Sequence, residues 1–154
     1  MDCARRFRKE AGFTIIELLI VVAIIGIIVA LATPNLISAI QRSRQSRTMA
    51  DMRMISQGIE AYQNDHSDYP IVSDGTVDML NADLQIYIRK YNHLDGWGEP
   101  FTYDSDGIHY TMVSFALGGA ETLPRPFGPT NTFDADIMFS DGLFVQWPEG
   151  PQTN

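Results

Sequence analysis

The chain has 154 residues, enough for one domain and a separate apolar segment, and it carries a formal charge of −8. Residues 65–154 hold 14 acidic side chains against three basic ones, so nucleic acid is an unfavourable partner for this half of the chain. The single cysteine, Cys3, excludes an intramolecular disulfide. The sequence also has no phosphate-binding glycine loop, no zinc-ligand spacing and no nucleophile with an identifiable base, which argues against an enzyme.

The first predicted element is an apolar helix that begins near Phe13. The 20 residues from Phe13 to Ala32 contain one charged side chain, Glu17. As a helix, this run would measure roughly 30 Å, the thickness of the hydrocarbon core of a bilayer. A carboxylate is costly in that environment, so Glu17 is expected to have both a partner and a function.

Three interpretations of this segment are open from the residues alone. It could be a plain signal anchor, or a secretory signal peptide cleaved after Ala32, since residues 30–32 have the small-x-small form of a cleavage site. The third interpretation depends on the residues before the run. Arginine and lysine side chains, then GFTIIE at residues 12–17 and an unbroken apolar helix, resemble the class III leader of type IV pilins and type II secretion pseudopilins.

The resemblance implies a specific processing of the N-terminus. A prepilin peptidase would remove a leader of residues 1–12 by cutting between Gly12 and Phe13, and would methylate the new terminal amine of Phe13. Residues 13–34 would then form the transmembrane and filament-core helix, with Glu17 as the fifth residue of the mature chain. In that family the glutamate neutralises the terminal amine of a neighbouring subunit, an attraction that is strong where the dielectric constant is low.

The helix is expected to continue past Pro34 to about residue 64. Gly26 and Pro34 weaken it, the first through its flexibility and the second because it has no N–H group. We therefore expect a continuous helix in the free subunit, and the resemblance implies unwinding between these two residues in a filament. Basic residues flank the apolar run on both sides, so only the resemblance orients it in the membrane.

The second half of this helix is expected to be amphipathic and to belong to a globular domain of residues 35–154. Residues 41–48, QRSRQSRT, contain no apolar side chain, so they are expected to be exposed in the monomer or to face neighbouring subunits in a filament. A further, short helix is expected around residues 77–84. The surface of the long helix that packs on a sheet is predicted by an apolar stripe at helical spacing, which consists of Met52, Ile55, Ile59 and Tyr62.

The distal part of the chain predicts a small antiparallel sheet built from two hairpins. The first joins residues 101–104 to residues 108–115 through Ser-Asp-Gly, and the second joins residues 137–139 to residues 143–147 through the same tripeptide. Residues 118–135 lie between the hairpins, are rich in glycine and proline, and are expected to be irregular. The expected fold is α+β and pilin-like, with the long helix packed on three to four strands.

Four short segments resemble signatures of one branch of that family, the major pseudopilins of type II secretion. They are Tyr69-Pro70, residues 95–100 (DGWGEP), residues 114–119 (SFALGG) and residues 134–137 (DADI).

The branch binds calcium between its last strands, so the resemblance implies a calcium site, which suits a domain with no disulfide. Glu121 would replace an aspartate that this sequence lacks, and a backbone carbonyl would contribute one oxygen. Trp97 is expected to contact the helix or the core. The ligands implied for calcium are the carbonyl of Leu117 and the side chains of Glu121, Asp134 and Asp136.

The resemblance also implies a structural function. The mature chain would be a subunit of a type II secretion pseudopilus, a helical homo-oligomer that helps to export folded proteins. Its partners would be minor pseudopilins or pilins, prepilin peptidase, and an inner-membrane assembly platform with its ATPase. The chain would cross the bacterial inner membrane once, with its C-terminal domain in the periplasm. Two alternatives are a type IV pilin that forms surface fibres for adhesion, motility or DNA uptake, and a secreted or membrane-anchored binding domain.

Overall fold

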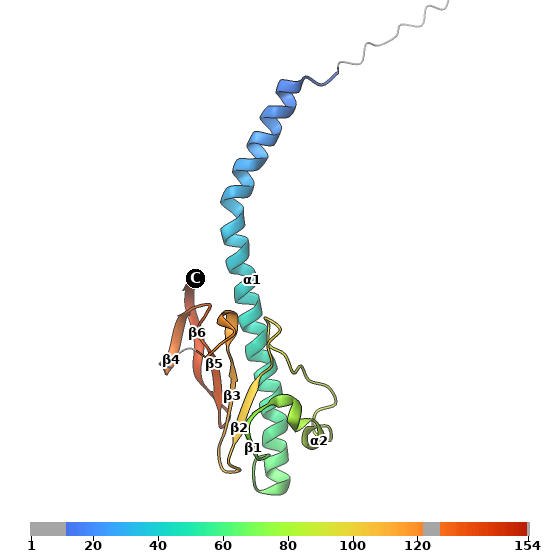
Figure 1. Cartoon of the computed structure of the whole chain (residues 1–154), viewed down its shortest axis with the longest axis vertical. Coiled ribbons are helices and arrows are strands. Elements are labelled where there is room, and N and C mark those ends of the chain that lie inside the picture. Colours follow the sequence, from blue (N-terminus) through green and yellow to red (C-terminus); the bar gives the residue numbers. More distant parts are fainter. Residues whose placement is uncertain (1–11, 122–126, 154) are drawn as a thin grey trace, which may run out of the picture. The chain divides into compact units, whose positions relative to one another are not determined.

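The computed structural model describes residues 12–121 and 127–153 (Figure 1). Its first element, the helix α1, runs from Ile15 to His66. Pro34 lies inside α1 and removes one backbone donor, yet the helix continues through it. At the preceding residue, the hydroxyl of Thr33 donates a hydrogen bond of 2.7 Å to the carbonyl oxygen of Val29. The continuous helix expected in the free subunit is therefore confirmed, and it ends slightly later than expected.

The chain forms two compact units, and the boundary between them lies within α1, between Ile37 and Ser38. In the first unit, every described residue from Gly12 to Ile37 is exposed. This part of α1 is also the one candidate membrane span among the described helices, judged by length and apolar composition. An apolar helix that is exposed all round needs lipid or other protein surfaces around it.

The second unit contains a six-stranded sheet (Figure 1). All neighbouring strands are antiparallel except β4 and β6, which are parallel. The short helices η1 (Val77–Leu80) and α2 (Asn81–Leu84) follow the first strand, and η2 (Ala116–Gly118) follows the third. The strands in sheet order are β1 (Val72–Thr76), β2 (Thr102–Ser105), β3 (Tyr110–Ser114), β5 (Ile137–Ser140), β6 (Leu143–Thr153) and β4 (Gly128–Thr132).

The α+β fold and both predicted hairpins are confirmed, and the short helix expected at residues 77–84 is present as η1 and α2. The expectation of three to four strands was wrong, because β1 and β4 were missed. The sequence of β1, VSDGT, is polar, and the strand pairs with β2 through a bulge at which Asp74 has a positive φ of 47°. The sequence of β4, GPTNT, lies in a segment expected to be irregular, and its partner β6 is distant in the chain.

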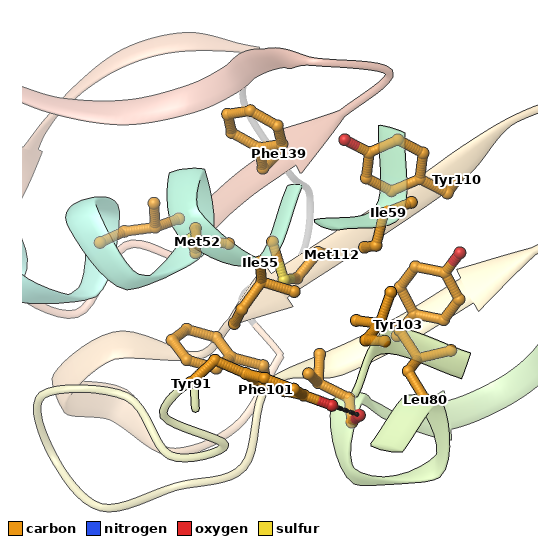
Figure 2. Packing of buried hydrophobic residues seen from close by; sticks show 13 residues of the cluster. Met52, Ile55, Ile59, Leu80, Tyr91, Phe101, Tyr103, Tyr110, Met112 and Phe139 are labelled. Atoms are coloured by element: carbon orange, nitrogen blue, oxygen red, sulfur yellow. Dashed lines mark hydrogen bonds between the residues drawn. The ribbon is translucent and has the colours of Figure 1, made fainter. Parts of the chain in front are cut away.

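One face of the sheet packs on α1 and forms the core of the second unit (Figure 2). Met52, Ile55 and Ile59 of α1 are fully buried, and Tyr62 is partly buried at the edge of the same cluster. Burial of an aliphatic side chain of this size contributes roughly 1.5–3 kcal/mol to folding. The predicted stripe is confirmed. The residues that it meets from the sheet and from the segment after β1 include Leu80, Tyr91, Phe101, Tyr103, Tyr110, Met112 and Phe139.

Candidate functional site

The first turn of α1 is closed by reciprocal hydrogen bonds between Thr14 and Glu17. One carboxylate oxygen of Glu17, Oε2, accepts the backbone N–H of Thr14 at 2.8 Å and the Thr14 hydroxyl at 2.7 Å. In return, the hydroxyl oxygen of Thr14 accepts the backbone N–H of Glu17 at 3.3 Å. This arrangement is a capping box, which satisfies two N–H groups that the start of a helix leaves without intrahelical partners.

Glu17 therefore has a partner within its own subunit. This partner was not predicted, although Thr-x-x-Glu before an apolar run is a signature of a helix start. The second carboxylate oxygen, Oε1, accepts no hydrogen bond from the described residues, and the side chain is exposed. The capping box thus orients the carboxylate close to Phe13 and leaves one oxygen available to a cation from outside the subunit.

Gly26 and Pro34, the two residues expected to weaken α1, both lie within the continuous helix. Apart from the backbone of its own helix turn and its chain neighbours, no described atom lies within 4 Å of the position that a Cβ would take at Gly26. The isolated subunit therefore has room for a side chain there, although glycine costs a helix roughly 1 kcal/mol relative to alanine. A glycine at this position is consistent with local unwinding, or with the close approach of another chain.

A loop of residues 94–100, here called the Asp95 loop, is organised by one buried carboxylate. Oδ1 of Asp95 accepts the backbone N–H groups of Trp97, Gly98 and Glu99 at 2.8, 2.9 and 3.0 Å. Oδ2 accepts the hydroxyl of Ser114, on β3, at 2.6 Å. These four hydrogen bonds offset the free energy that it costs to remove the Asp95 carboxylate from water on burial.

The Asp95 loop is bound to α1 by two side chains of the helix. The hydroxyl oxygen of Thr48 accepts the backbone N–H of Gly96 at 2.9 Å, and the side-chain carbonyl of Gln41 accepts the indole N–H of Trp97 at 2.7 Å. A Cβ at Gly96 would lie 2.6 Å from the carbonyl oxygen of Arg44, so the close approach requires glycine. The expectation that Trp97 contacts the helix is confirmed.

The expectation that residues 41–48 are exposed is wrong for part of that segment. Gln45 and Thr48 are buried. The Gln45 amide donates to Oε1 of Gln152 at 3.3 Å, and the amide of Gln152 donates to the carbonyl oxygens of Thr130 and Glu149 at 2.8 and 3.0 Å. These polar side chains can be buried because the Asp95 loop and the C-terminal strand supply their hydrogen bonds, which a hydrophobicity pattern cannot reveal.

Two families match the chain in succession along its length. Residues 7–33 match the prokaryotic N-terminal methylation motif, and residues 35–131 match type II secretion system protein G. The chain belongs to the type II secretion protein G family. The resemblance to pseudopilins found in the sequence is thereby confirmed, and the family is one of structural subunits and not of enzymes.

Several relatives of this protein G family cover most of the chain. The type II secretion system core protein G of Vibrio cholerae is 28% identical over 122 residues, which span 74% of this chain and 84% of the relative. The core protein G of Escherichia coli K12 is 26% identical over 128 residues, spanning 82% and 88%. That of Pseudomonas aeruginosa is 27% identical, spanning 72% and 84%. A comparison with solved structures gave no match.

Part of the calcium site implied for such a subunit is brought together. Helix η2 lies against the segment before β5, because the backbone N–H of Leu117 donates to the carbonyl oxygen of Phe133 at 3.2 Å. A Cβ at Gly118 would lie 3.4 Å from the carbonyl oxygen of Asp134. The side chain of Asp134 is exposed and that of Asp136 is fully buried. Two carboxylates and nearby carbonyl groups are oxygen ligands of the kind that calcium prefers.

The remaining implied ligand, Glu121, lines a hollow of about 430 Å³ together with Asp74 and Asp104. Thr111 and Val113 also line it, and they alternate with the core residue Met112, so the hollow lies on the sheet face away from α1. Among the described residues, no three acidic, histidine or cysteine side chains are arranged to hold a metal. The described residues therefore supply only part of the ligand set that a calcium ion requires.

Proposed function

We infer that this chain is a structural subunit of the type II secretion pseudopilus. One observation carries the inference: the methylation motif at residues 7–33 is followed directly by the protein G match at residues 35–131. The relatives named above are core proteins of that secretion system. The exposed apolar part of α1 supplies the surface that such a subunit would bury, first in lipid and then against other subunits.

We propose that prepilin peptidase cuts between Gly12 and Phe13 and methylates Phe13. The leader would be residues 1–12, of which 1–11 lie outside the described part of the structure. Residues 13–34 would then anchor the chain in the bacterial inner membrane, with residues 35–154 as a periplasmic domain. The match to the methylation motif and the candidate membrane span support this proposal.

In the assembled homo-oligomer, Glu17 would accept the methylated terminal amine of a neighbouring subunit. The capping box supports this role, because it orients the carboxylate and leaves Oε1 available. Such a charge pair is strongly attractive in an apolar filament core, and breaking it there would leave two buried charges. Gly26 and Pro34 would allow the helix to unwind locally. Minor pseudopilins and an assembly platform with its ATPase would be the further partners.

We also propose that calcium binds beside η2, through the carbonyl of Leu117 and the side chains of Asp134 and Asp136. The hydrogen bond between Leu117 and Phe133 supports it, since it places the two segments side by side. Bound calcium would link these segments to each other. A chelator should then lower the melting temperature of the domain, and Asp134→Asn should remove that effect. A chelator that leaves the melting curve unchanged would show that these acids are ordinary surface and core residues.

Mass spectrometry of the N-terminus of the chain isolated from membranes tests the processing. A methylated Phe13 is the expected first residue. Thr33 as the first residue would instead show that a signal peptide is removed after Ala32, and the filament proposal would then be wrong.

Immunogold electron microscopy with an antibody against residues 35–154 tests which kind of filament the chain forms. Label confined to the cell envelope is expected for a pseudopilus, together with retention of normally exported proteins when the chain is deleted. Long labelled surface fibres with unchanged protein export would instead indicate a type IV pilin.

A further inference from the structure

The second unit exposes three aliphatic side chains at the end where α1 terminates. Ile71, Ile108 and Leu143 are 69%, 71% and 72% exposed. The Ile71 side chain lies 3.3 Å from the position of a Cβ at Gly107, so it adjoins the turn that contains Ile108. Ile71 precedes β1, Ile108 lies between β2 and β3, and Leu143 begins β6. Exposed aliphatic side chains that gather on one part of a surface are typical of an interaction site.

The turn before Leu143 lies against the turn that contains Ile108. One carboxylate oxygen of Asp141 accepts the backbone N–H of Tyr110 at 3.0 Å, and the other lies 2.9 Å from the ring nitrogen Nδ1 of His109. Figure 1 shows both hairpin turns toward the end of the domain at which α1 finishes. We call this surface the tip. Its members are Ile71, Ile108 and Leu143 with the exposed acids Asp68, Asp106 and Asp141.

The opposite end of the domain, which we call the base, is basic. It is the part of α1 that carries the exposed side chains of Arg42, Arg44 and Arg47. Arg47 pairs with Asp51 at 3.8 Å, whereas Arg42 and Arg44 form no ion pair with any described residue. Two exposed acids also lie at this end, Glu99 in the Asp95 loop and Glu149 in β6.

The tip and the base are separated by most of the length of the domain. A Cβ at Gly142 would lie 2.9 Å from Oε1 of Glu60, whereas Gln152 binds Gln45, so β6 runs from the tip toward the base. Residues 44 and 66 are roughly 33 Å apart along a helix of 1.5 Å rise per residue. One copy therefore cannot bring its own tip to its own base.

We propose that the tip of one copy docks on the base of a second copy of this chain. The apolar residues of the tip would be covered by the second copy, and its aspartates would face Arg42 and Arg44. Arginine is enriched in protein interfaces, and opposite charges on the two surfaces fix orientation and suppress other pairings. Contact between two tips would place aspartates against aspartates, so the head-to-tail arrangement is favoured.

This contact deepens the proposed function and rests on it. A head-to-tail contact between unlike surfaces leaves one tip and one base unused, so it repeats from copy to copy and generates a helical filament when the rotation does not close a ring. It would join the globular domains of the pseudopilus outside the bundle of apolar helices. No other class of partner is needed, because the same chain carries both surfaces.

Disulfide trapping in assembled filaments tests the contact. The full chain would carry Cys3→Ser, Arg44→Cys and Ile108→Cys and would be produced in its secretion-competent host. Sheared filaments treated with a mild oxidant should give a ladder of dimers and higher oligomers on a non-reducing gel. The matched control replaces Arg44→Cys by Ile86→Cys, which is exposed but belongs to neither surface, and should give no ladder.

The outcomes separate this inference from the proposed function. Filaments of normal yield that give no ladder would overturn the tip-to-base contact alone. If the unmodified chain forms no filaments in that host, both the proposed function and the tip-to-base contact are wrong. A ladder from the Ile86→Cys control as strong as that from the test pair would also overturn the contact, since trapping would then be nonspecific.

Charge reversal provides a second, independent test. Asp68→Arg and Arg44→Asp should each reduce the yield of sheared filaments about fivefold, because each places like charges across the contact. The double variant restores opposite charges and should recover most of the yield. Two single variants that assemble normally, or a double variant that is worse than either, would overturn the proposal.

Discussion

Asp95 and Ser114 are joined by a hydrogen bond of 2.6 Å that ties the loop docked on α1 to β3, an interior strand of the sheet. The other oxygen of Asp95 organises the loop, and the loop in turn holds α1 through Gly96 and Trp97. One carboxylate therefore links the helix layer to the sheet layer by polar contacts, in addition to the apolar core between them.

Asp95→Ala should lower the free energy of unfolding of the domain from Ser38 onward by about 2–3 kcal/mol, since it leaves the buried Ser114 hydroxyl and three part-buried backbone N–H groups without an acceptor. Asp95→Asn should cost less, because its amide oxygen can still accept the backbone N–H groups of the loop. Urea unfolding followed by circular dichroism measures both variants. Equal stability of Asp95→Ala and the unmodified domain would show that the loop contributes little to the fold.

Gly26→Ala should leave the free subunit intact or stabilise its helix by about 1 kcal/mol, because a Cβ meets no atom there. In filaments, the same change should reduce the yield, since alanine opposes both unwinding and close approach of a neighbouring helix. Circular dichroism in micelles and the quantity of sheared filaments measure the two effects.

Val29→Ile, which adds one carbon to the same span, is the control and should assemble normally. If Gly26→Ala assembles normally, Gly26 is needed neither for unwinding of the helix nor for close approach of a neighbouring one.

The stability of the domain should fall in alkaline solution because of its buried tyrosines. Burial raises the pKa of Tyr110 to about 12 and raises that of Tyr103 still further. Their neutral forms are favoured in the folded state, so this stability is present below pH 10 and is lost as the pH rises through 12. Each unit of pKa difference corresponds to about 1.4 kcal/mol.

Melting temperatures measured from pH 8 to 12 check this prediction, with Tyr110→Phe as the informative variant. That variant loses hydrogen bonds to Ser56 and Gly142, so it should melt lower at pH 8. It should also lose less stability between pH 10 and 12, since one buried group no longer ionises. A variant with the same pH dependence as the unmodified domain would contradict the assignment to Tyr110.

The role of Glu17 in assembly can be separated from its role in the capping box. Glu17→Val should leave membrane insertion intact, because it removes a charge from an apolar helix, yet it should abolish filaments. Thr14→Val removes the hydroxyl of the capping box but keeps the backbone N–H that Glu17 accepts, so it should still assemble. Membrane fractionation and filament shearing give both readouts. Filaments from Glu17→Val would rule out the proposed charge pair.

The fold was largely predictable from the sequence because its strongest signals are local. The apolar run, the stripe at Met52, Ile55 and Ile59, and the two Ser-Asp-Gly turns each depend on neighbouring residues. β4 was missed because β6, its one neighbour in the described part of the sheet, joins it through parallel pairing rather than through a hairpin. Gln45 and Thr48 were misplaced for the same reason, since the groups that satisfy them come from the Asp95 loop and the end of β6.

The candidate site was only partly predictable. Residues 12–17 carry the processing and assembly signals in one short motif, and the capping box could have been read from Thr14 and Glu17. A contact of Trp97 with the helix or the core was expected, but the docking of the whole DGWGEP segment on α1 could not be read in the same way. It requires the position of Gly96 against the backbone of Arg44, which no spacing of residue types reports.

The place of β6 in the sheet has a consequence for the order in which the domain can be completed. β6 is the last strand of the chain and lies between β5 and β4, so β4 has no neighbour until β6 arrives. If residues 35–154 cross the membrane in chain order, the first hairpin arrives early, while β4 stays unpaired until residues 143–153 follow. The sheet can therefore be completed only after β6 has crossed the membrane. In a subunit truncated before β6, β5 would be an edge strand and β4 would stay unpaired. Such a domain would be open to proteolysis and would not enter the filament.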